Sequence, residues 1–436
     1  MHLAAGWAAR RGRALHAFIV DHGLQPGSAA AAAGAAAQAR ALGVPARILR
    51  WEGEKPRAGV QQAAREARLR LLAQACREAG AEALLLAHTL DDQAETVWQR
   101  AGAGSAWRGL AAMRAEAPAP LWPDMGAVRG RPLTVLRPLL ETRRAELREF
   151  LISVGAEWTE DPANADPRYG RVRARAALAA LGDDAAVRLA GIAARAGALA
   201  DAEDAAARAL LVHVAAPHDG TLRIAHAALD APGAARLIQA ALAAAAGAAR
   251  PPSPEAVERL MDKVRAGRGA TLGGATVLPR AHALVICRDA GAALGRAGVP
   301  APEPLPLTPG ADAIWDGRWA VRAHAPDLCI APLGMAWKGL KERAKAQLAE
   351  IPAAARASLP ALWRGGRLAE ALPGAEAAGL ASLRPLAAGR LRRLLFTKFP
   401  WFDEEYAEIF CGPGGDAPSQ APHGINRQAN LTDRCR

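Results

Sequence analysis

Residues 83–96, with the sequence ALLLAHTLDDQAET, decide the fold class of this chain. The stretch begins with five apolar residues and then carries His88, Asp91, Asp92 and Glu95. A short apolar run that stops at polar residues is typical of a buried strand in a parallel sheet. The residues after it favour a helix start, because acidic side chains stabilise a helix N-terminus. We therefore expect a strand that delivers a polar site at its carboxyl end.

Strands and helices also alternate before this stretch. The predicted elements are a strand over 14–20, a helix over 28–42, a strand over 46–51, a helix over 60–79 and the strand over 82–87. This order predicts an α/β fold with a parallel sheet and right-handed crossovers. Ligands of such sheets bind beyond the carboxyl ends of the strands, where Asp21 and His88 both fall. These polar residues therefore mark the rim of a predicted active-site crevice.

The length of 436 residues predicts several domains, because single cores rarely grow past about 250 residues. We expect the α/β domain over 1–182, a mainly helical middle domain over 183–295, a Pro-rich linker over 296–312, a small α+β domain over 313–410 and a disordered tail over 411–436. The middle domain also contains a predicted strand pair with a turn at Gly273-Gly274. In the small domain, we expect a hairpin at Asp316-Gly317 and a basic helix over 340–349.

The composition favours a polyanionic partner such as nucleic acid. Lys and Arg number 55 against 43 Asp and Glu, a net charge of +12. A genome that favours Arg and Ala codons explains part of this excess. Five cysteines without a C-x-x-C pair argue against a zinc ribbon and a disulfide framework. With no signal peptide and no apolar stretch of membrane-spanning length, we expect a cytoplasmic location and no membrane partner.

The acidic cluster after the strand has several possible interpretations. His88, Asp91, Asp92 and Glu95 are spaced so that they share one helical face. Thr89 and Asp92 fit a capping box, which alone explains two of these residues. The carboxylates also suit Mg²⁺ or the ammonium group of an amino-acid substrate. A functional site is favoured, because a capping motif requires neither His88 nor Glu95.

Two further groups of residues give weaker evidence for a functional site. Residues Asp21, His22, Gly23 and Leu24 combine a carboxylate, an imidazole and a glycine at a strand end, and an Asx turn is the favoured reading.

The second group is basic. Arg168, Arg171 and Arg175 are spaced to share one helical face, with Arg173 beside them. A solvated basic surface and a phosphate- or carboxylate-binding site are equally favoured there.

Together these segments resemble a known family. The chain is similar to tRNA(Ile)-lysidine synthetase, an N-type PP-loop ATPase with an adenine nucleotide alpha hydrolase-like fold. The motifs that match in order and spacing are VDHGLQPGS, AREARLRLL, AHTLDDQAET, GAGSAWRGLAAM, LRPLLETRRAELREFL and EWTEDPANADPRYGRVRAR. The segment LKERAKAQLAEIPAAARASLPALWRGGRL is similar to that family's C-terminal domain. The resemblance covers about residues 3–410.

The resemblance implies a ligase. Such an enzyme uses ATP and Mg²⁺ to adenylate the wobble cytidine of isoleucine tRNA with a CAU anticodon. Free L-lysine then attacks, which releases AMP and leaves lysidine.

The resemblance also assigns residues. It puts Asp21, His22, Gly23 and Leu24 near the nucleotide, and it assigns lysine and reaction-centre contacts to Asp91, Asp92 and Glu95, with His88 as their orienting neighbour. Arg171 and Arg175, with Arg168 beside them, would contact nucleotide or tRNA, and the basic 340–349 helix would bind the acceptor arm. The oligomeric state stays open, a homodimer included.

One departure from the family is large. PP-loop ATPases begin with a strand and an S-G-G-x-D-S loop that binds pyrophosphate, and this sequence contains neither. Residues 1–18 match the helix that follows the loop. We therefore expect two open strand edges within the sheet, weak ATP binding and no lysidine formation by the chain as printed. A start codon placed too far downstream is favoured over a true truncation or a chain that binds tRNA without catalysis.

Two rival functions remain. A related PP-loop tRNA thiolase would need cysteines at the active site, and the α/β domain has only Cys76, on a predicted core stripe. A non-catalytic tRNA-binding protein would bind tRNA with a steep salt dependence and bind ATP weakly.

Overall fold

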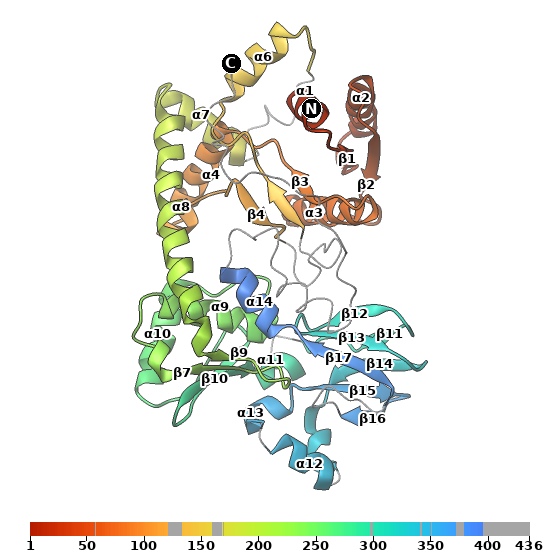
Figure 1. Cartoon of the computed structure of the whole chain (residues 1–436), viewed down its shortest axis with the longest axis vertical. Coiled ribbons are helices and arrows are strands. Elements are labelled where there is room, and N and C mark those ends of the chain that lie inside the picture. Colours follow the sequence, from red (N-terminus) through yellow and green to blue (C-terminus); the bar gives the residue numbers. More distant parts are fainter. Residues whose placement is uncertain are drawn as a thin grey trace.

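The computed structural model describes residues 1–56, 58–120, 133–158, 168, 170–296, 300–340, 342–349, 351–371 and 379–395. An N-terminal α/β part occupies the upper half of Figure 1, and two sheet-containing parts lie below it. The predicted tail over 411–436 lies outside the described residues. Within them, no helix combines the length and the apolar character needed to cross a membrane.

The α/β part confirms the predicted alternation of strands and helices. Its first elements are α1 (His2–Arg11), β1 (Ala17–Asp21), α2 (Ser28–Ala41), β2 (Ala46–Arg50), α3 (Val60–Glu78), β3 (Ala83–Leu85) and α4 (Leu90–Gly102). Strands β1 and β2 are parallel, with Ala17 opposite Ala46. Strand β3 is parallel to β5 (Thr134–Leu136), and β4 (Glu116–Pro118) is antiparallel to β5.

The sheet of this part is divided in two. Among the described residues, β1 pairs only with β2, and β3 pairs only with β5. Both halves nevertheless share one hydrophobic cluster with α3: it contains side chains of α3, β3 and β5, and side chains of β1 and β2 pack against it. The sheet therefore has two open edges above one common helix, in agreement with the sequence prediction.

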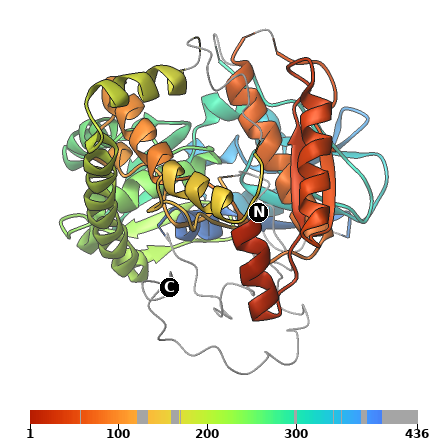
Figure 2. The same ribbon diagram turned by 90° about the horizontal axis from the view of Figure 1, so that it is seen from above.

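A long helix joins the α/β part to the rest. After α5 (Trp107–Leu110), α6 (Arg144–Ser153) and α7 (Gly170–Ala180), helix α8 (Ala185–Ala209) descends along one side of the molecule (Figure 1). At 1.5 Å per residue, α8 spans about 38 Å. Figure 2 shows α8 and the N-terminal helix α2 on opposite sides. Near its lower end, buried Asp204 is paired with Arg108 of α5 and Arg236 of α9, so the helix fixes both parts.

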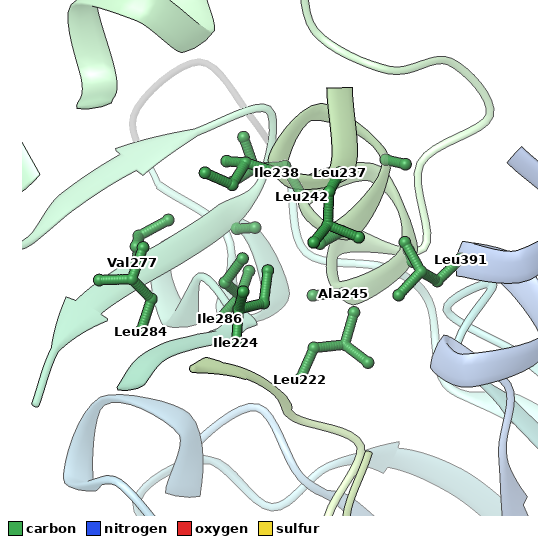
Figure 3. Close-up of a cluster of buried hydrophobic side chains, with 14 of the residues drawn as sticks. Leu222, Ile224, Leu237, Ile238, Leu242, Ala245, Val277, Leu284, Ile286 and Leu391 are labelled. Atoms are coloured by element: carbon green, nitrogen blue, oxygen red, sulfur yellow. The ribbon is translucent and has the colours of Figure 1, made fainter. Parts of the chain in front are cut away.

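The middle part contains more strands than the sequence predicts. Its elements are β6 (Val214–Ala215), β7 (Leu222–Ala225), α9 (Ala234–Ala246), α10 (Pro254–Arg265), β8 (Ala270–Leu272), β9 (Ala275–Pro279), β10 (Ala283–Arg288) and α11 (Ala290–Leu294). The strands form an antiparallel sheet in the order β6-β7-β10-β9-β8. Leu237 and Leu242 of α9 pack on Ile224 and Ile286 of this sheet (Figure 3). The predicted Gly273-Gly274 turn is confirmed, with φ angles of 60° and 85°.

The C-terminal part contains two small sheets. Their strands are β11 (Leu305–Leu307), β12 (Asp312–Trp315), β13 (Trp319–Ala323), β14 (Leu328–Pro332), β15 (Pro360–Arg364), β16 (Arg367–Ala371) and β17 (Ala381–Pro385). The sheets have the orders β11-β14-β15-β16 and β12-β13-β17. The hairpin at Asp316-Gly317 is confirmed, because β12 and β13 flank it as an antiparallel pair.

The predicted linker over 296–312 is partly wrong, since it contains β11. Pro306 is tolerated there because β11 lies at the edge of its sheet, and Leu307 is buried. Short helices α12 (Glu342–Leu348) and α13 (Ala353–Arg356) follow the 3-10 helix Gly334–Gly339, so a helix occupies the predicted basic segment. The last described helix, α14 (Ala387–Leu395), returns to the α/β part, where Arg393 donates to the carbonyl of Ala119.

Candidate active site at the carboxyl edge of the sheet

Asp92 has the capping role that the sequence predicts. Thr89 is the N-cap of α4, and Asp92 Oδ2 accepts hydrogen bonds from Thr89 N and Thr89 Oγ1, both at 2.8 Å. Asp92 Oδ1 lies 3.5 Å from Nη2 of Arg144. Burial on its own would raise the pKa of Asp92, but the Thr89 hydrogen bonds and Arg144 lower it below its usual value. Asp92 is therefore an anion that fixes the helix start.

Asp91 joins two helix starts. Its Oδ2 atom accepts a hydrogen bond from the backbone N of Arg144, the first residue of α6, at 2.7 Å. Its Oδ1 atom lies 3.9 Å from Nε of Arg143. Since acceptors at a helix N-terminus satisfy free backbone amides, Asp91 holds α6 against the start of α4.

Glu95 is the most deeply buried of the predicted site residues. Its side chain is 2% exposed, and Oε1 accepts a hydrogen bond from Nε of Arg175 at 3.0 Å and lies 3.6 Å from Nη2 of Arg144. Its other oxygen, Oε2, is buried and has no hydrogen-bond partner among the described residues. Buried carboxylate oxygens are normally hydrogen-bonded, so Glu95 Oε2 is available to accept a hydrogen bond from a ligand.

The structure therefore brings the three predicted carboxylates together through one arginine. Arg144 contacts Asp91 by its backbone and Asp92 and Glu95 by its guanidinium. The sequence analysis missed this residue. The only signal was its place in the motif LRPLLETRRAELREFL, which does not reveal that α6 begins beside α4.

His88 lies between β3 and α4 and is a neutral base. Its Nδ1 atom is buried without a hydrogen-bond partner in the described part of the chain. Burial lowers the pKa of His88 to about 4, with Asp92 acting in the opposite direction and Arg137 and Arg171 reinforcing the shift. The imidazole is therefore uncharged at neutral pH and able to accept a proton.

The second predicted cluster follows β1. Asp21 Oδ1 accepts from Gly23 N at 3.0 Å, and Gly23 has a φ of +61°, so the predicted Asx turn is confirmed. Hydrogen bonds from Ser28 and then Gly23 lower the pKa of Asp21. The neighbouring Leu24 side chain is exposed.

His22 links this cluster to the first one. Its Nδ1 atom is also buried without a partner among the described residues. The pKa of His22 is lowered by burial and then by Arg68, which also lowers that of His88. Because one guanidinium acts on both imidazoles, the two clusters flank one space, as expected at the carboxyl edge of the sheet.

Three arginines lie around this space without a carboxylate partner among the described residues. Arg65 and Arg68 project from α3, and Arg171 projects from α7. The pKa values of Arg65 and Arg68 are lowered by partial burial and then by neighbouring arginines. Within the described ranges, no salt bridge joins any of the three to a carboxylate. Such a cluster favours an anionic ligand. The sequence analysis missed Arg65 and Arg68, because their spacing reads only as the outer face of a helix.

The predicted arginine face of 168–175 is partly wrong. Helix α7 begins at Gly170, so Arg168 precedes it and does not share its face, since residues spaced by three or four align only inside a helix. Arg168 is exposed, and its carbonyl accepts from Arg173 Nη1 at 2.9 Å. Arg171 and Arg175 do reach the site, the former beside the other arginines and the latter on Glu95.

Cys76 is part of the core, as predicted. It is 1% exposed on α3, and burial raises the pKa of its thiol to about 11, which makes it unreactive. The described residues also contain no group of three or more His, Cys, Asp or Glu side chains arranged to hold a metal ion.

Comparisons with known proteins give the family of this chain. The PP-loop domain family matches residues 1–181. A tRNA(Ile)-lysidine synthase of Caulobacter vibrioides is 42% identical over 82% of this chain and 78% of its own length. One from Hyphomonas neptunium is 37% identical over 76% of this chain and 85% of its own.

Among solved structures, a U34-tRNA thiolase, NcsA from Methanococcus maripaludis with its [4Fe-4S] cluster, is similar at 15% identity and a TM-score of 0.34. That similarity covers 42% of this chain and 62% of the other. The identity and coverage of the two synthases are high enough to decide the family. The chain belongs to the tRNA(Ile)-lysidine synthase family.

Proposed function

We propose that the protein ligates free lysine to the wobble cytidine of CAU-anticodon isoleucine tRNA, in an ATP-dependent reaction through an adenylated cytidine. The names of the relatives support the reaction class. The observation that carries the proposal is Glu95, a buried carboxylate with one oxygen that has no hydrogen-bond partner among the described residues.

These residues suit an ammonium substrate. Lysine presents an ε-ammonium group, which needs carboxylates for binding and must lose a proton before it can attack. Glu95 Oε2 provides the unpaired acceptor, while Asp91 and Asp92 hold the helix starts and the negative charge around it. His88 is uncharged at neutral pH and therefore does not repel the ammonium group, and Glu95 Oε2 is the acceptor for the proton that the ammonium group loses. The ε-nitrogen then bonds to C2 of the adenylated cytidine, and AMP leaves with the C2 oxygen.

The arginines suit the anionic substrates. Arg65, Arg68 and Arg171 lack carboxylate partners among the described residues, so the phosphates of ATP or of the tRNA anticodon stem would relieve their mutual repulsion. We assign the turn from Asp21 to Leu24 to the nucleotide side of the same space. Arg168, outside α7, is assigned to tRNA phosphate.

Magnesium fits the described residues less well. Asp91, Asp92 and Glu95 already accept hydrogen bonds or ion pairs from Thr89, Arg144 and Arg175, and no metal-binding group of side chains is present in the described ranges. Mg²⁺ commonly binds through substrate phosphates with few protein ligands. No step of the proposed reaction depends on a protein-held ion.

The test is incorporation of labelled lysine into an isoleucine tRNA transcript with a CAU anticodon. A transcript whose CAU anticodon is changed to GAU serves as the matched substrate control. Transfer that requires ATP and cytidine at the wobble position supports the proposal, and absence of transfer by a form that contains a pyrophosphate loop contradicts it.

A second candidate is a tRNA-binding protein without catalysis. The cluster of Arg65, Arg68 and Arg171 suits it, because phosphate binding by arginines requires no catalytic step. Salt-dependent tRNA binding combined with no ATP binding would support this candidate. The thiolase alternative is disfavoured by the buried, unreactive Cys76.

A further inference from the structure

Arg137 is a buried arginine beside the candidate active site. It directly follows β5 and is 8% exposed. Strand β5 pairs with β3, and Leu84 and Val135 lie opposite each other, buried in the cluster that these strands share with α3. Every second side chain of a strand shares a face, so Arg137 and His88 project on this same side at the carboxyl edge. In agreement, Arg137 contributes to the lowered pKa of His88.

Only Nη1 of this guanidinium is hydrogen-bonded among the described residues. It donates to the carbonyl of Arg114 at 2.9 Å. Nε of Arg137 is buried without a partner, and Nη2 makes no hydrogen bond with a described residue. The N–H groups of Nε and Nη2 point in parallel and form the fork that binds both oxygens of a carboxylate. The fork of Arg137 is therefore available to a ligand.

The same fork binds a carboxylate elsewhere in this chain. Arg322 donates from Nε and Nη2 to the two oxygens of Asp312, at 2.8 and 2.7 Å. Arg288 does the same with Asp316, at 3.1 and 2.9 Å. Arg137 is more deeply buried than Arg322, yet no carboxylate of the described ranges pairs with it. An unpaired buried charge is costly, so an anion at this fork would stabilise the site.

The position of Arg137 favours a small anion over a phosphate chain. Arg65, Arg68 and Arg171 are exposed, whereas Arg137 is buried, so it lies at the closed end of the space that they flank. Burial and then Arg65 lower the pKa of Arg137. The exposed arginines suit the phosphates assigned to them above, because a phosphate chain can stay partly hydrated there. The buried fork suits a single carboxylate.

The site thus contains unpaired buried groups of both charges. Glu95 Oε2 is a buried acceptor without a partner, and Arg137 Nε is a buried donor without one, both among the described residues. Buried polar groups are normally hydrogen-bonded, so each of these atoms is suited to a ligand contact. A ligand with an ammonium group at one end and a carboxylate at the other matches both.

The backbone that orients Arg137 is itself fixed by α4. Gln93 exchanges two hydrogen bonds with the backbone of Met113, at 2.8 and 2.9 Å. Ala112 has a φ of +49°, in the left-handed region that is unfavourable for residues other than glycine. The Arg114 carbonyl that accepts from Arg137 follows directly. Because α4 also carries the site carboxylates, the fork and the carboxylates belong to one rigid unit.

We infer that Arg137 binds the α-carboxylate of free lysine and so selects the amino acid over amines that lack this group. The inference rests on the proposed function, in which Glu95 receives the ε-ammonium group. Arg137 is then a specificity-determining residue. Its contact with the carboxylate, which does not react, would direct the side chain of the substrate towards Glu95.

The test uses two substitutions of Arg137. Arg137→Gln removes the charge and keeps a donor for the Arg114 carbonyl, whereas Arg137→Lys keeps the charge and removes the fork. Arg100→Gln is the matched control, because Arg100 is also partly buried in this part and donates to backbone carbonyls of the same segment. Thermal unfolding of each variant is compared with that of the parent chain.

L-lysine and L-lysinamide, which has an amide in place of the carboxylate, are titrated by calorimetry. We expect Arg137→Gln to raise the Kd of lysine about 10-fold to 100-fold, as for a charge-assisted pair of hydrogen bonds, and Arg137→Lys to raise it less. Lysinamide should bind the parent chain as weakly as lysine binds Arg137→Gln, and its Kd should change less than about twofold in that variant. The lysinamide result in the parent chain tests the contact even where a variant is unstable.

Three outcomes would overturn the inference. One is unchanged lysine binding by Arg137→Gln, and another is an equal loss for lysine and lysinamide or an equal loss in Arg100→Gln, which would show that Arg137 acts through structure. The third is weaker ATP binding with unchanged lysine binding, which would assign the fork to phosphate.

Lysine transfer is scored separately, in a form of the chain that has lysidine activity. There Arg137→Gln should raise the KM for lysine and leave the KM for ATP and for tRNA unchanged. Lysine binding that depends on Arg137 without transfer by any form would contradict the proposed ligation alone. Transfer with an unchanged KM for lysine would contradict the role of Arg137 alone, and absence of lysine binding by every form would contradict both.

Discussion

Arg175 donates from Nε to Oε1 of Glu95 at 3.0 Å, and this bond joins α7 to α4 across 80 residues of sequence. It leaves Glu95 with a different environment on each oxygen, one paired and one buried without a partner in the described structure. Since unsatisfied buried acceptors are costly, such an atom is most readily understood as a ligand contact.

Replacement of Glu95 by Gln should strongly impair lysine transfer while the fold survives. Gln keeps the shape and removes the charge that binds the ammonium group, and Arg175, whose side chain is 40% exposed, can return to solvent. We expect a loss of about 10²-fold or more in the rate of lysine incorporation, as for other groups that act directly on a reacting proton or charge. The rate is measured in a form of the chain that has lysidine activity.

Glu82→Gln is the control for this change. Glu82 is an exposed carboxylate of the same part, and its ion pair with Arg13 is long, at 3.9 Å. Normal turnover in Glu95→Gln would assign Glu95 to structure alone.

The cap of α4 allows stability and chemistry to be separated. Thr89→Ala removes the side chain that Asp92 N and Asp92 Oδ2 contact, and it should lower the free energy of unfolding by about 1 kcal/mol. Asp92→Asn keeps the side-chain volume and should impair lysine transfer in addition. Urea unfolding and lysine incorporation are measured on both variants, and equal loss of activity in both would show that Asp92 acts only as a cap.

The pH dependence of stability should reveal the lowered pKa of His88. Its folded pKa of about 4 lies below the ordinary value of 6.5, so between these values the unfolded chain binds a proton that the folded chain does not. The contribution of the neutral imidazole is therefore complete above about pH 6.5 and is lost as the pH falls towards 4. We expect a decrease of about 1 to 3 kcal/mol in the free energy of unfolding over this window.

His88→Gln isolates that contribution, because Gln does not titrate. The variant should show a smaller decrease between pH 6.5 and 4.5 than the parent chain, in urea unfolding followed by tryptophan fluorescence. His16→Gln is the control. Parallel pH curves for the parent and His88→Gln would mean that His88 is protonated as easily in the folded chain as in the unfolded one.

Local patterns predicted much of this molecule. The apolar runs and glycine stops gave β1, α2, β2, α3 and β3 within a few residues, and the Thr89–Asp92 capping box followed from spacing alone. Such features depend on residues that are close in sequence, so they can be predicted without a structure.

Long-range contacts were not readable in the same way. Arg144 reaches Glu95 only because α6 begins beside α4, and no spacing in the sequence encodes that approach. Strand β11 forms because β14 offers a partner edge, although Pro306 and its neighbours resemble a linker. The helical pattern predicts Arg68 as a solvated residue. In the structure, Arg171 of α7 acts on its guanidinium, which in turn acts on His22 and His88. Tertiary packing thus places in the site, or in a strand, residues that the local sequence pattern predicts to be on the surface.

The divided sheet leads to the last prediction, which concerns ATP. Strands β1 and β3 each lack a partner on one side among the described residues, while α3 packs against both. A form extended at its N-terminus with an apolar strand and an S-G-G-x-D-S loop should complete this sheet, because paired edges satisfy backbone groups that are otherwise open. We expect the chain as printed to bind ATP weakly and to transfer no lysine, and the extended form to bind ATP tightly and to transfer lysine.

Calorimetry with ATP and incorporation of labelled lysine are the measurements for both forms. The control extension carries the same strand with the loop changed to A-A-A-x-A-A, which separates repair of the sheet from binding of phosphate. We expect this control to raise the midpoint of thermal unfolding as much as the full extension and to leave ATP binding weak. Tight ATP binding and lysine transfer by the printed chain would instead show that Arg65, Arg68 and Arg171 hold the triphosphate without a loop, and that the candidate site is complete as it stands.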